Sequence, residues 1–364
     1  MNTKNWRVIP AVIAAGILSF SGVLIETSMN VTFPKLMSEF STNANGVQWV
    51  TTGYLLAIAI IVPISAFLIR NFSTKELFIL SNFLFLFGTV LDSFSPSLTL
   101  LLVGRILQGI GTGIALPLMF HIILTKSPIK SRGMMMGIGS MITSLAPAIG
   151  PTYGGVLLNT LGWRSIFWFL IILILISLVI GLNSIPSEKV QRTEKFPFKT
   201  FIFLGLGLSF VLLSIEKMSL LMAIVGIFSL VIFYIINQKQ KLLQLTLFQN
   251  NRFNFYMYGF LAYQAILLGL SFILPNYLQL NLHVSAAAAG AFMFPGALIS
   301  AVLAPISGSM LDRIGQYRPI LLGLIVSTVA LCLMFFYFPT LNFWTFMLSH
   351  MLLMVGIGLS YANL

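Results

Sequence analysis

Two charged side chains stand within long apolar stretches of this sequence. Glu26 lies in the stretch from Leu24 to Pro34, and Arg105 begins the run R-I-L-Q-G-I-G-T-G. An ionised side chain inside a membrane segment costs on the order of 3 kcal/mol or more, so such residues usually face a bundle interior or water and often mark a proton path. Glu26 is therefore a candidate for reversible protonation. The alternative is a structural carboxylate paired with a neighbouring helix.

Arg105 requires a partner in the same way, because its guanidinium stays charged under all ordinary conditions. In its expected helix it lies about 10 Å from the end, a depth close to that of Glu26. Their similar depth allows the two side chains to pair. A purely structural ion pair is the alternative.

A stripe of small residues forms a third feature. Ala146, Gly150 and Gly154 recur every fourth residue, which places them on one helix face where another backbone can approach closely. Pro147 and Pro151 share the same spacing, so the helix is expected to bend twice toward one side. A tightly packed transmembrane helix without a further role is the alternative interpretation.

The composition requires a membrane to hold these elements. Of 364 residues, 58% are hydrophobic and 8% are charged, which excludes a soluble domain. The formal net charge of +12 is attributed to orientation signals in cytoplasmic loops and not to nucleic-acid binding. Cys332 is the single cysteine, and His121, His283 and His350 are too scattered for a metal site, so we expect no metal and no cofactor.

Apolar runs of about 20 residues predict twelve membrane spans, the first of them an uncleaved span and not a signal peptide. With a cytoplasmic amino terminus, only Lys35, Arg164 and Lys217 among the basic residues fall on the opposite side, so both visible ends are expected to be cytoplasmic. The spans are expected near 9–30, 47–69, 77–94, 98–124, 134–158, 164–185, 200–216, 218–237, 253–275, 284–311, 319–338 and 342–362.

An internal repeat relates the two halves of the chain. The segment from Ala66 recurs from Gly308, 308 − 66 = 242 positions later, and Gly109 recurs as Gly356, 356 − 109 = 247 positions later. Such repeats predict two pseudo-symmetric six-helix bundles with the substrate path between them. The expected parts are a first bundle at 1–185, a cytoplasmic linker at 186–199, an inserted helical hairpin at 200–238 and a partial second bundle of four helices at 239–364.

The same offset predicts missing helices. Leu364 corresponds to position 364 − 247 = 117, within span four, so counterparts of spans five and six are expected to be lacking. The chain as given is then expected to insert into a membrane but to transport only when extended by two spans.

Three motifs resemble those of proton-coupled drug exporters in the major facilitator superfamily. The stretch G-P-T-Y-G-G, which ends in Gly154 and Gly155, resembles their fifth-helix antiporter motif. The segment around Glu26 resembles their first-helix motif, in which the acid is commonly aspartate, and the segment from Arg105 resembles their fourth-helix motif R-x-x-Q-G-x-G, whose arginine is associated with proton transfer. The resemblance implies an all-α polytopic membrane protein of the major facilitator fold.

The resemblance also implies a cytoplasmic gate in the loop after span ten. Its residues are Gly308, Asp312, Arg313, Gly315 and Arg318. The glycine permits a tight turn, and the acid can reach helix ends and basic groups that hold the gate shut. In the first copy of this loop Arg70 and Ser73 replace the expected acid and glycine, which puts gating there in doubt.

Further polar and aromatic residues are candidates for the substrate cavity. They are Asn30, Gln108, Tyr256, Tyr263, Gln264 and His350, the last close to the repeat counterpart of Arg105. Other polar or aromatic residues are expected at the surface, with Trp49 and Tyr54 in an aromatic belt, Asp92 solvated, and Glu216 and Lys217 in a solvated turn.

The resemblance implies proton-coupled efflux of drugs or other amphipathic small molecules from a bacterial cytoplasm. The resemblance is to the fourteen-span class, of the multidrug or lincomycin-resistance type, in the cytoplasmic membrane. The expected partners are drug substrates, protons and lipid, with no nucleic acid, and the protein is expected to be a monomer. A nutrient or ion symporter of the same fold is the alternative. A membrane-embedded enzyme is the other rival, but the chain carries no H-E-x-x-H, G-x-S-x-G or phosphate-loop pattern.

Overall fold

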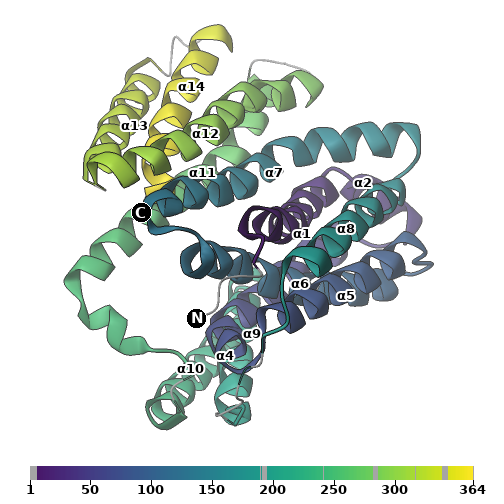
Figure 1. Cartoon of the computed structure of the whole chain (residues 1–364). Helices are drawn as coiled ribbons and strands as arrows, with labels where there is room; N and C mark the ends of the chain where they lie inside the picture. Colours follow the sequence, from purple (N-terminus) through teal and green to yellow (C-terminus); the bar gives the residue numbers. More distant parts are fainter. Residues whose placement is uncertain are drawn as a thin grey trace. The chain divides into compact units, whose positions relative to one another are not determined.

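The computed structural model of the chain describes residues 6–188, 190, 195–240, 242–281, 286–315, 317–337 and 343–363. Within these ranges every regular element is helical and no strand occurs, which confirms the predicted all-α fold (Figure 1). The elements are α1 (Val8–Asn30), α2 (Phe33–Glu39), α3 (Ala44–Ile61), η1 (Val62–Ile64), α4 (Ser65–Asn71), α5 (Thr74–Ser93), α6 (Leu98–Lys126), η2 (Ile129–Ser131), α7 (Arg132–Thr160), α8 (Ser165–Ser184), α9 (Phe198–Glu216), α10 (Leu220–Gln240), η3 (Leu245–Gln249), α11 (Asn251–Asn281), α12 (Ala286–Ile314), α13 (Tyr317–Tyr337), α14 (Phe343–Ser360) and η5 (Tyr361–Asn363).

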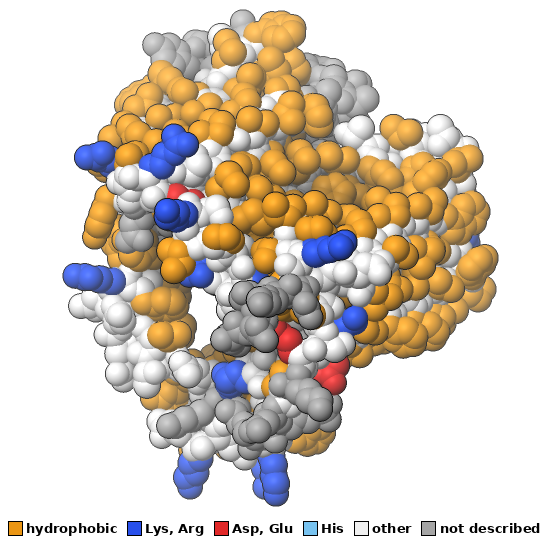
Figure 2. Space-filling view, in the orientation of Figure 1, with side chains coloured by type: hydrophobic (Ala, Val, Ile, Leu, Met, Phe, Trp, Pro, Cys, Tyr) orange, Lys and Arg blue, Asp and Glu red, His pale blue; other side chains and the backbone are white. Residues whose placement is uncertain are grey.

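Eleven helical segments in the described part of the chain are long and apolar enough to cross a membrane, with α3, η1 and α4 joined as one segment. The expected span at 253–275 lies within α11, and the expected boundaries at 284, 338 and 342 fall outside the described residues. Hydrophobic side chains cover much of the face in Figure 2, and Phe228 on α10 is 64% exposed. Such apolar surface suits lipid and not water, so the prediction of a multi-pass membrane protein is confirmed.

Local sequence signals set several helix boundaries. The side chain of Asn43 accepts a hydrogen bond from the amide of Gly46 (2.9 Å) and caps α3. Ser73 and Glu76 form a capping box at the start of α5, in which each side chain accepts from the other residue's amide. Pro63 lacks an amide hydrogen, and the chain forms the tighter turn η1 at that point between α3 and α4.

The described residues form two compact units. The first comprises residues 1–22, 32–119 and 163–246. In it α5 packs on α8, α3 contacts α9, and α9 and α10 pack against each other. A side chain at Gly226 of α10 would lie 2.8 Å from the amide nitrogen of Val211, so the glycine allows the two backbones of the hairpin to approach.

The second unit comprises residues 23–31, 120–162 and 247–364. In it α7 packs along α12, and α14 packs against both α12 and α13. The contact between α7 and α12 is close because it joins glycines: a Cβ on Gly133 would lie 2.5 Å from the carbonyl oxygen of Gly308. The predicted boundaries of the two bundles and of the linker remain predictions.

Candidate functional site

Glu26 lies half-buried on α1, beside the residues through which this helix contacts α7. The hydroxyl of Ser28 donates to the carbonyl of Leu24 (2.6 Å) and to that of Gly150 (3.0 Å). The turn of α1 that carries Glu26 is therefore fixed against the helix that carries the predicted antiporter motif. Any role of Glu26 in proton transfer, and its predicted pairing with Arg105, remain predictions.

The small-residue stripe of α7 makes the close backbone contact that its spacing predicts. Ala146, Gly150 and Gly154 are all buried. A Cβ on Gly150 would lie 2.9 Å from the Cβ of Thr27, and one on Gly154 would lie 2.5 Å from the carbonyl oxygen of Ser28. Larger residues at either glycine would therefore push α1 away from α7.

The other residues of the motif do not share this contact. Pro147 and Pro151 are exposed, and the helix continues through both. A Cβ on Gly155 would meet no atom within 4 Å. The structure thus divides the motif into a packed face and a face that leaves α1 untouched.

Arg105 is fully buried on α6 and lies in a polar network that joins three helices. Its Nε donates to the carbonyl of Val50 on α3 (2.9 Å), and its Nη1 donates to Gln108 Oε1 (2.7 Å). Its guanidinium carbon lies 4.1 Å from the ring centroid of Tyr54. Gln108 Nε2 donates in turn to Thr89 Oγ1 on α5 (3.0 Å). A buried cation is tolerated because hydrogen bonds and an aromatic face replace its lost water.

Helical spacing explains how the three helices meet at this cation. Val50 and Tyr54 are four residues apart on α3, and Arg105 and Gln108 are three apart on α6, so each pair shares one face. Thr89 also donates to the carbonyl four residues before it, which leaves its oxygen lone pair for Gln108. Of these residues, the sequence indicated only Arg105 and Gln108.

Tyr54 corrects a sequence-based expectation. It was expected in an aromatic belt at the membrane interface, but it is fully buried. Its hydroxyl donates to the carbonyl of Gly22 (2.8 Å) and lies 2.8 Å from Thr112 Oγ1. The sequence could not show whether Tyr54 lies at the membrane interface or in the protein interior. Its spacing from Trp49 is compatible with both positions, because an interfacial tyrosine and a buried one follow the same helical period.

Asp92 provides a second correction. It was expected to be solvated, but its side chain on α5 is fully buried. No described residue donates a hydrogen bond to either carboxyl oxygen. One feature of the sequence could have indicated this burial. Asp92 follows Gly88 by four residues, which places both on the face of α5 that contacts α6.

An ion pair outside the membrane spans joins α2 to the start of α8. Arg164 Nη1 donates to Glu39 Oε1 (2.7 Å), and its Nη2 donates to the carbonyl of Ser95 (2.7 Å). The indole of Trp163 donates to Glu39 Oε2 (2.8 Å). Partial burial by itself raises the pKa of Glu39, but the two hydrogen bonds and the charge of Arg164 outweigh it, so this pKa is lowered below its ordinary value of 4.5.

The last turn of α12 holds the start of α7 through one carboxylate, that of Asp312, which was expected from the sequence to lie in the following loop. Asp312 Oδ1 accepts from the amide of Gly133 (2.8 Å), and its Oδ2 accepts from that of Met134 (2.9 Å). These amides belong to the first turn of α7, whose N–H groups have no partner within the helix and favour a negative charge. Gly315 adopts a positive φ of 80°, as expected for the turn, while Arg313 and Arg318 are exposed.

The remaining cavity candidates lie in varied surroundings. Asn30 is exposed at the end of α1, and Tyr256 and Gln264 are half-buried on α11. Tyr263 is buried, and its hydroxyl donates to Ser327 Oγ on α13 (3.4 Å). His350 is fully buried on α14, with its ring 5.5 Å from that of Phe292.

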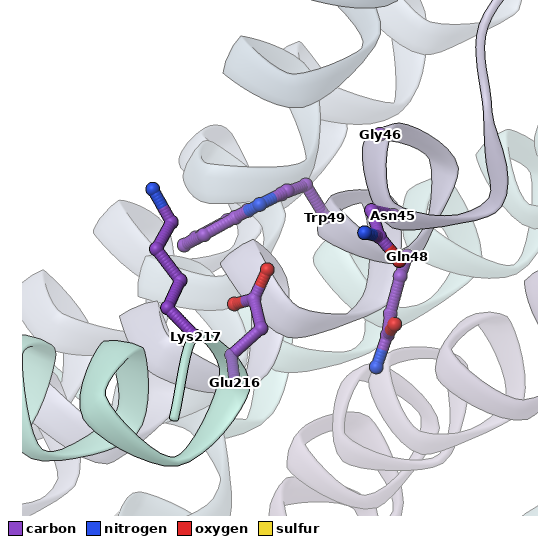
Figure 3. A pocket seen from close by; sticks show the side chains of 6 residues that line it. All are labelled: Asn45, Gly46, Gln48, Trp49, Glu216 and Lys217. Atoms are coloured by element: carbon purple, nitrogen blue, oxygen red, sulfur yellow. The ribbon is translucent and has the colours of Figure 1, made fainter. Parts of the chain in front are cut away.

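A polar pocket lies where the start of α3 meets the end of α9 (Figure 3). It has a volume of about 540 Å³ and is lined by Asn45, Gly46, Gln48, Trp49, Glu216 and Lys217. In Figure 3 the side chains of Glu216 and Lys217 point toward the indole of Trp49. Glu216 and Lys217 are exposed, in agreement with the expected turn, and the structure adds that Trp49 faces them.

Known proteins resemble this chain over nearly its whole length. A family profile described as the Major Facilitator Superfamily matches residues 15–364. Lincomycin resistance protein LmrB of Bacillus subtilis (strain 168) is 30% identical over 370 residues, which cover 98% of this chain and 77% of that protein. Riboflavin transporter RibZ of Clostridioides difficile (strain 630) is 27% identical over 318 residues, covering 86% and 69%. The solved structure of the proton:xylose symporter XylE bound to 6-bromo-6-deoxy-D-glucose gives a TM-score of 0.67 at 14% identity and covers 100% of this chain and 81% of that chain, which shows a shared fold.

Proposed function

The chain belongs to the Major Facilitator Superfamily, and from this premise we propose that it exports drugs or other amphipathic small molecules in exchange for protons. The family and the XylE fold make it a multi-pass membrane transporter and not an enzyme. Similarity to a lincomycin resistance protein supports a drug as the substrate. We place the protein in a bacterial cytoplasmic membrane with its amino terminus in the cytoplasm, and in the fourteen-span class.

The observation that carries the proposal is the buried guanidinium of Arg105. A permanent cation in the membrane is costly, yet here α3 supplies a carbonyl and an aromatic ring to it, and α6 supplies the amide oxygen of Gln108, which α5 holds in turn through Thr89. A network of this kind has two uses for transport. It fixes the relative positions of α3, α5 and α6, and it provides a fixed positive charge against which a nearby acid can gain or lose a proton.

We assign the proton-accepting role to Glu26. Its turn of α1 is held against Gly150 and Gly154 of α7, so a change in its charge acts directly on the contact between these helices. Asp312 is assigned to the cytoplasmic gate, because its release from the first turn of α7 would remove two hydrogen bonds that join α12 to α7. The substrate is assigned to a path that alternating access opens to one side of the membrane and then to the other.

Drug accumulation in intact cells tests this function. Cells that express the full-length protein should accumulate less drug than control cells, and a protonophore should abolish the difference. In membrane vesicles, Glu26→Gln should abolish drug movement driven by a pH gradient, because it keeps the side-chain volume and removes the titratable group. Undiminished gradient-driven efflux by Glu26→Gln would remove Glu26 from the mechanism.

A pair of adjacent glycines tests the contact between α1 and α7. Gly154→Ala should lower the thermal stability of the purified protein, because its Cβ would lie 2.5 Å from the carbonyl oxygen of Ser28. Gly155→Ala is the matched control, since its Cβ meets nothing within 4 Å and alanine favours a helix by about 1 kcal/mol over glycine. Equal effects of the two substitutions would show that the stripe does not depend on close packing.

Similarity to a riboflavin transporter favours a second function, the transport of a vitamin-like nutrient by the same fold. The direction of substrate movement relative to the proton gradient distinguishes drug export from nutrient import. In inside-out vesicles acidified inside, an exporter that exchanges drug for protons accumulates its substrate, whereas a proton-coupled importer does not. Accumulation of riboflavin and not of lincomycin in right-side-out vesicles acidified outside would favour the second function.

A further inference from the structure

The side chain of Asp92 has no role in holding the end of its helix. Its backbone carbonyl accepts hydrogen bonds from the amide (3.3 Å) and the hydroxyl (3.1 Å) of Ser95, which complete the turn after α5. The carboxyl group itself is fully buried, and within the described part of the chain neither oxygen accepts a hydrogen bond. A buried carboxylate without such bonds is strongly unfavourable, whereas the neutral acid is tolerated.

The carboxyl group lies against α6 beside Arg105. A Cβ on Gly104 would lie 2.7 Å from Asp92 Cγ, so the missing side chain of this glycine provides the space that the carboxyl group occupies. A second glycine contact brings the helices together one turn away, where a Cβ on Gly88 would lie 2.5 Å from the carbonyl oxygen of Gly104. Arg105 follows Gly104 directly on α6, so the guanidinium and the Asp92 carboxyl group belong to neighbouring positions of the contact between α5 and α6.

Few other charges face Asp92. On the elements packed against α5, the nearest are Arg105 of α6 and Arg164 at the start of α8. Arg164 is already bound to Glu39 and to the carbonyl of Ser95. Arg70 of α4 precedes the opposite end of α5, about 25 Å or more away along the helix. Neither α3 nor α8 carries a charged residue within its helical range. Arg105 is therefore the charge to which a proton on Asp92 responds.

We propose that Asp92 is a second proton-binding residue of the transport cycle. It is protonated in the arrangement seen here, in which Arg105 donates to Gln108. When the guanidinium turns toward α5, the carboxyl O–H bond breaks, the proton passes to water beyond Ser95, and the resulting carboxylate pairs with Arg105. Arg105 keeps its own protons throughout, because guanidinium does not deprotonate in proteins. This inference rests on the proposed function, in which protons drive transport.

Infrared difference spectroscopy of the full-length purified protein tests the protonation directly. Raising the pH should remove the carbonyl band of a protonated carboxylic acid, and Asp92→Asn should lack that component. Asp92→Glu, which keeps an acid at this position, should shift the band and not delete it. Spectra that are the same in wild type and Asp92→Asn would overturn the proposal, whatever the transport activity.

Transport in proteoliposomes tests the role in coupling. Asp92→Asn should lower drug movement driven by a pH gradient at least about tenfold, while drug exchange without a gradient stays within about twofold of wild type. Ser93→Ala is the matched control: its buried hydroxyl donates to the backbone carbonyl of Thr89 within α5, and both rates should stay unchanged. Full gradient-driven transport by Asp92→Asn would overturn the inference alone. Absence of gradient-driven transport in wild type would instead overturn the proposed function, and the infrared result would still decide whether Asp92 binds a proton.

Discussion

Arg105 on α6 and His350 on α14 occupy similar places in the two repeats, but their surroundings are opposite in character. They lie 350 − 105 = 245 positions apart, close to the 247 that separate Gly109 from Gly356. Both side chains are fully buried. Arg105 donates to α3 and within α6 and stacks on a tyrosine, whereas in the described residues neither ring nitrogen of His350 has a hydrogen-bond partner.

The packing around His350 also differs from that around Arg105. His350 lies against Phe292, and a Cβ on Gly296 would lie 2.7 Å from its Nδ1, so a glycine and an aromatic ring enclose it. A guanidinium is always charged and must be matched by acceptors, while an imidazole has a neutral form that an apolar site accepts. The comparison teaches that one repeat keeps a fixed charge at this depth and the other does not. We therefore expect the charged residues that couple transport to protons to be concentrated in the first repeat, which holds both Glu26 and Arg105.

Of the substitutions that test this contrast between Arg105 and His350, Arg105→Lys should have the largest effect. A lysine is still a cation, but it lacks the planar fork that reaches Val50 and Gln108 while stacking on Tyr54. We expect drug efflux driven by a pH gradient in vesicles to fall by about tenfold or more. A wild-type rate would show that any cation suffices at this place, and the distinction from His350 would then be one of charge alone.

Gln108→Leu should have the next largest effect, because Gln108 links Arg105 to Thr89. Its removal leaves a charged donor with one partner fewer inside the protein, which costs about 2 kcal/mol. Thermal unfolding in detergent measures the loss. Gln48→Leu, at an exposed position on α3, is the matched control and should change stability by less than about 0.5 kcal/mol.

His350→Leu should leave stability unchanged or raise it by on the order of 1 kcal/mol, since it replaces two ring nitrogens without hydrogen bonds by an apolar side chain of similar size. The same thermal unfolding experiment serves as the measurement. A clear loss of stability would contradict the contrast, because it would mean that the imidazole has an essential partner as Arg105 does.

Breaking the ion pair of Glu39 and Arg164 should have the smallest effect on stability. This pair lies outside the membrane spans and serves as a reference for the buried sites. Glu39→Gln should lower stability near neutral pH by about 1 kcal/mol or less. Because the pKa of Glu39 is lowered in the folded protein, its contribution is present above the ordinary value of 4.5 and is lost as the pH falls through the folded value. Thermal stability followed from neutral to acidic pH should therefore fall less steeply in Glu39→Gln than in wild type. Identical pH dependence would show that this pair does not stabilise the fold.

The order and bounds of the membrane helices could be predicted from the sequence with small errors. The expected spans at 98–124 and 200–216 correspond to α6 (Leu98–Lys126) and α9 (Phe198–Glu216). Hydropathy succeeds here because a lipid-exposed backbone must satisfy its hydrogen bonds within each helix, so an apolar run of sufficient length has one solution. The short helix α2 (Phe33–Glu39) was not anticipated, because seven residues give too little periodicity.

By itself the sequence determined which side chains are anomalous in a membrane, since Glu26 and Arg105 stand out from apolar neighbours wherever the helices pack. It also determined that the stripe at Gly150 and Gly154 would admit another backbone. Only the tertiary structure decided which backbone that is, namely α1 beside Glu26, and only it placed Tyr54 and Asp92 next to Arg105's helix. The physical reason is that helical period fixes the face on which a residue lies, while the helix that covers this face depends on packing between segments far apart in the chain.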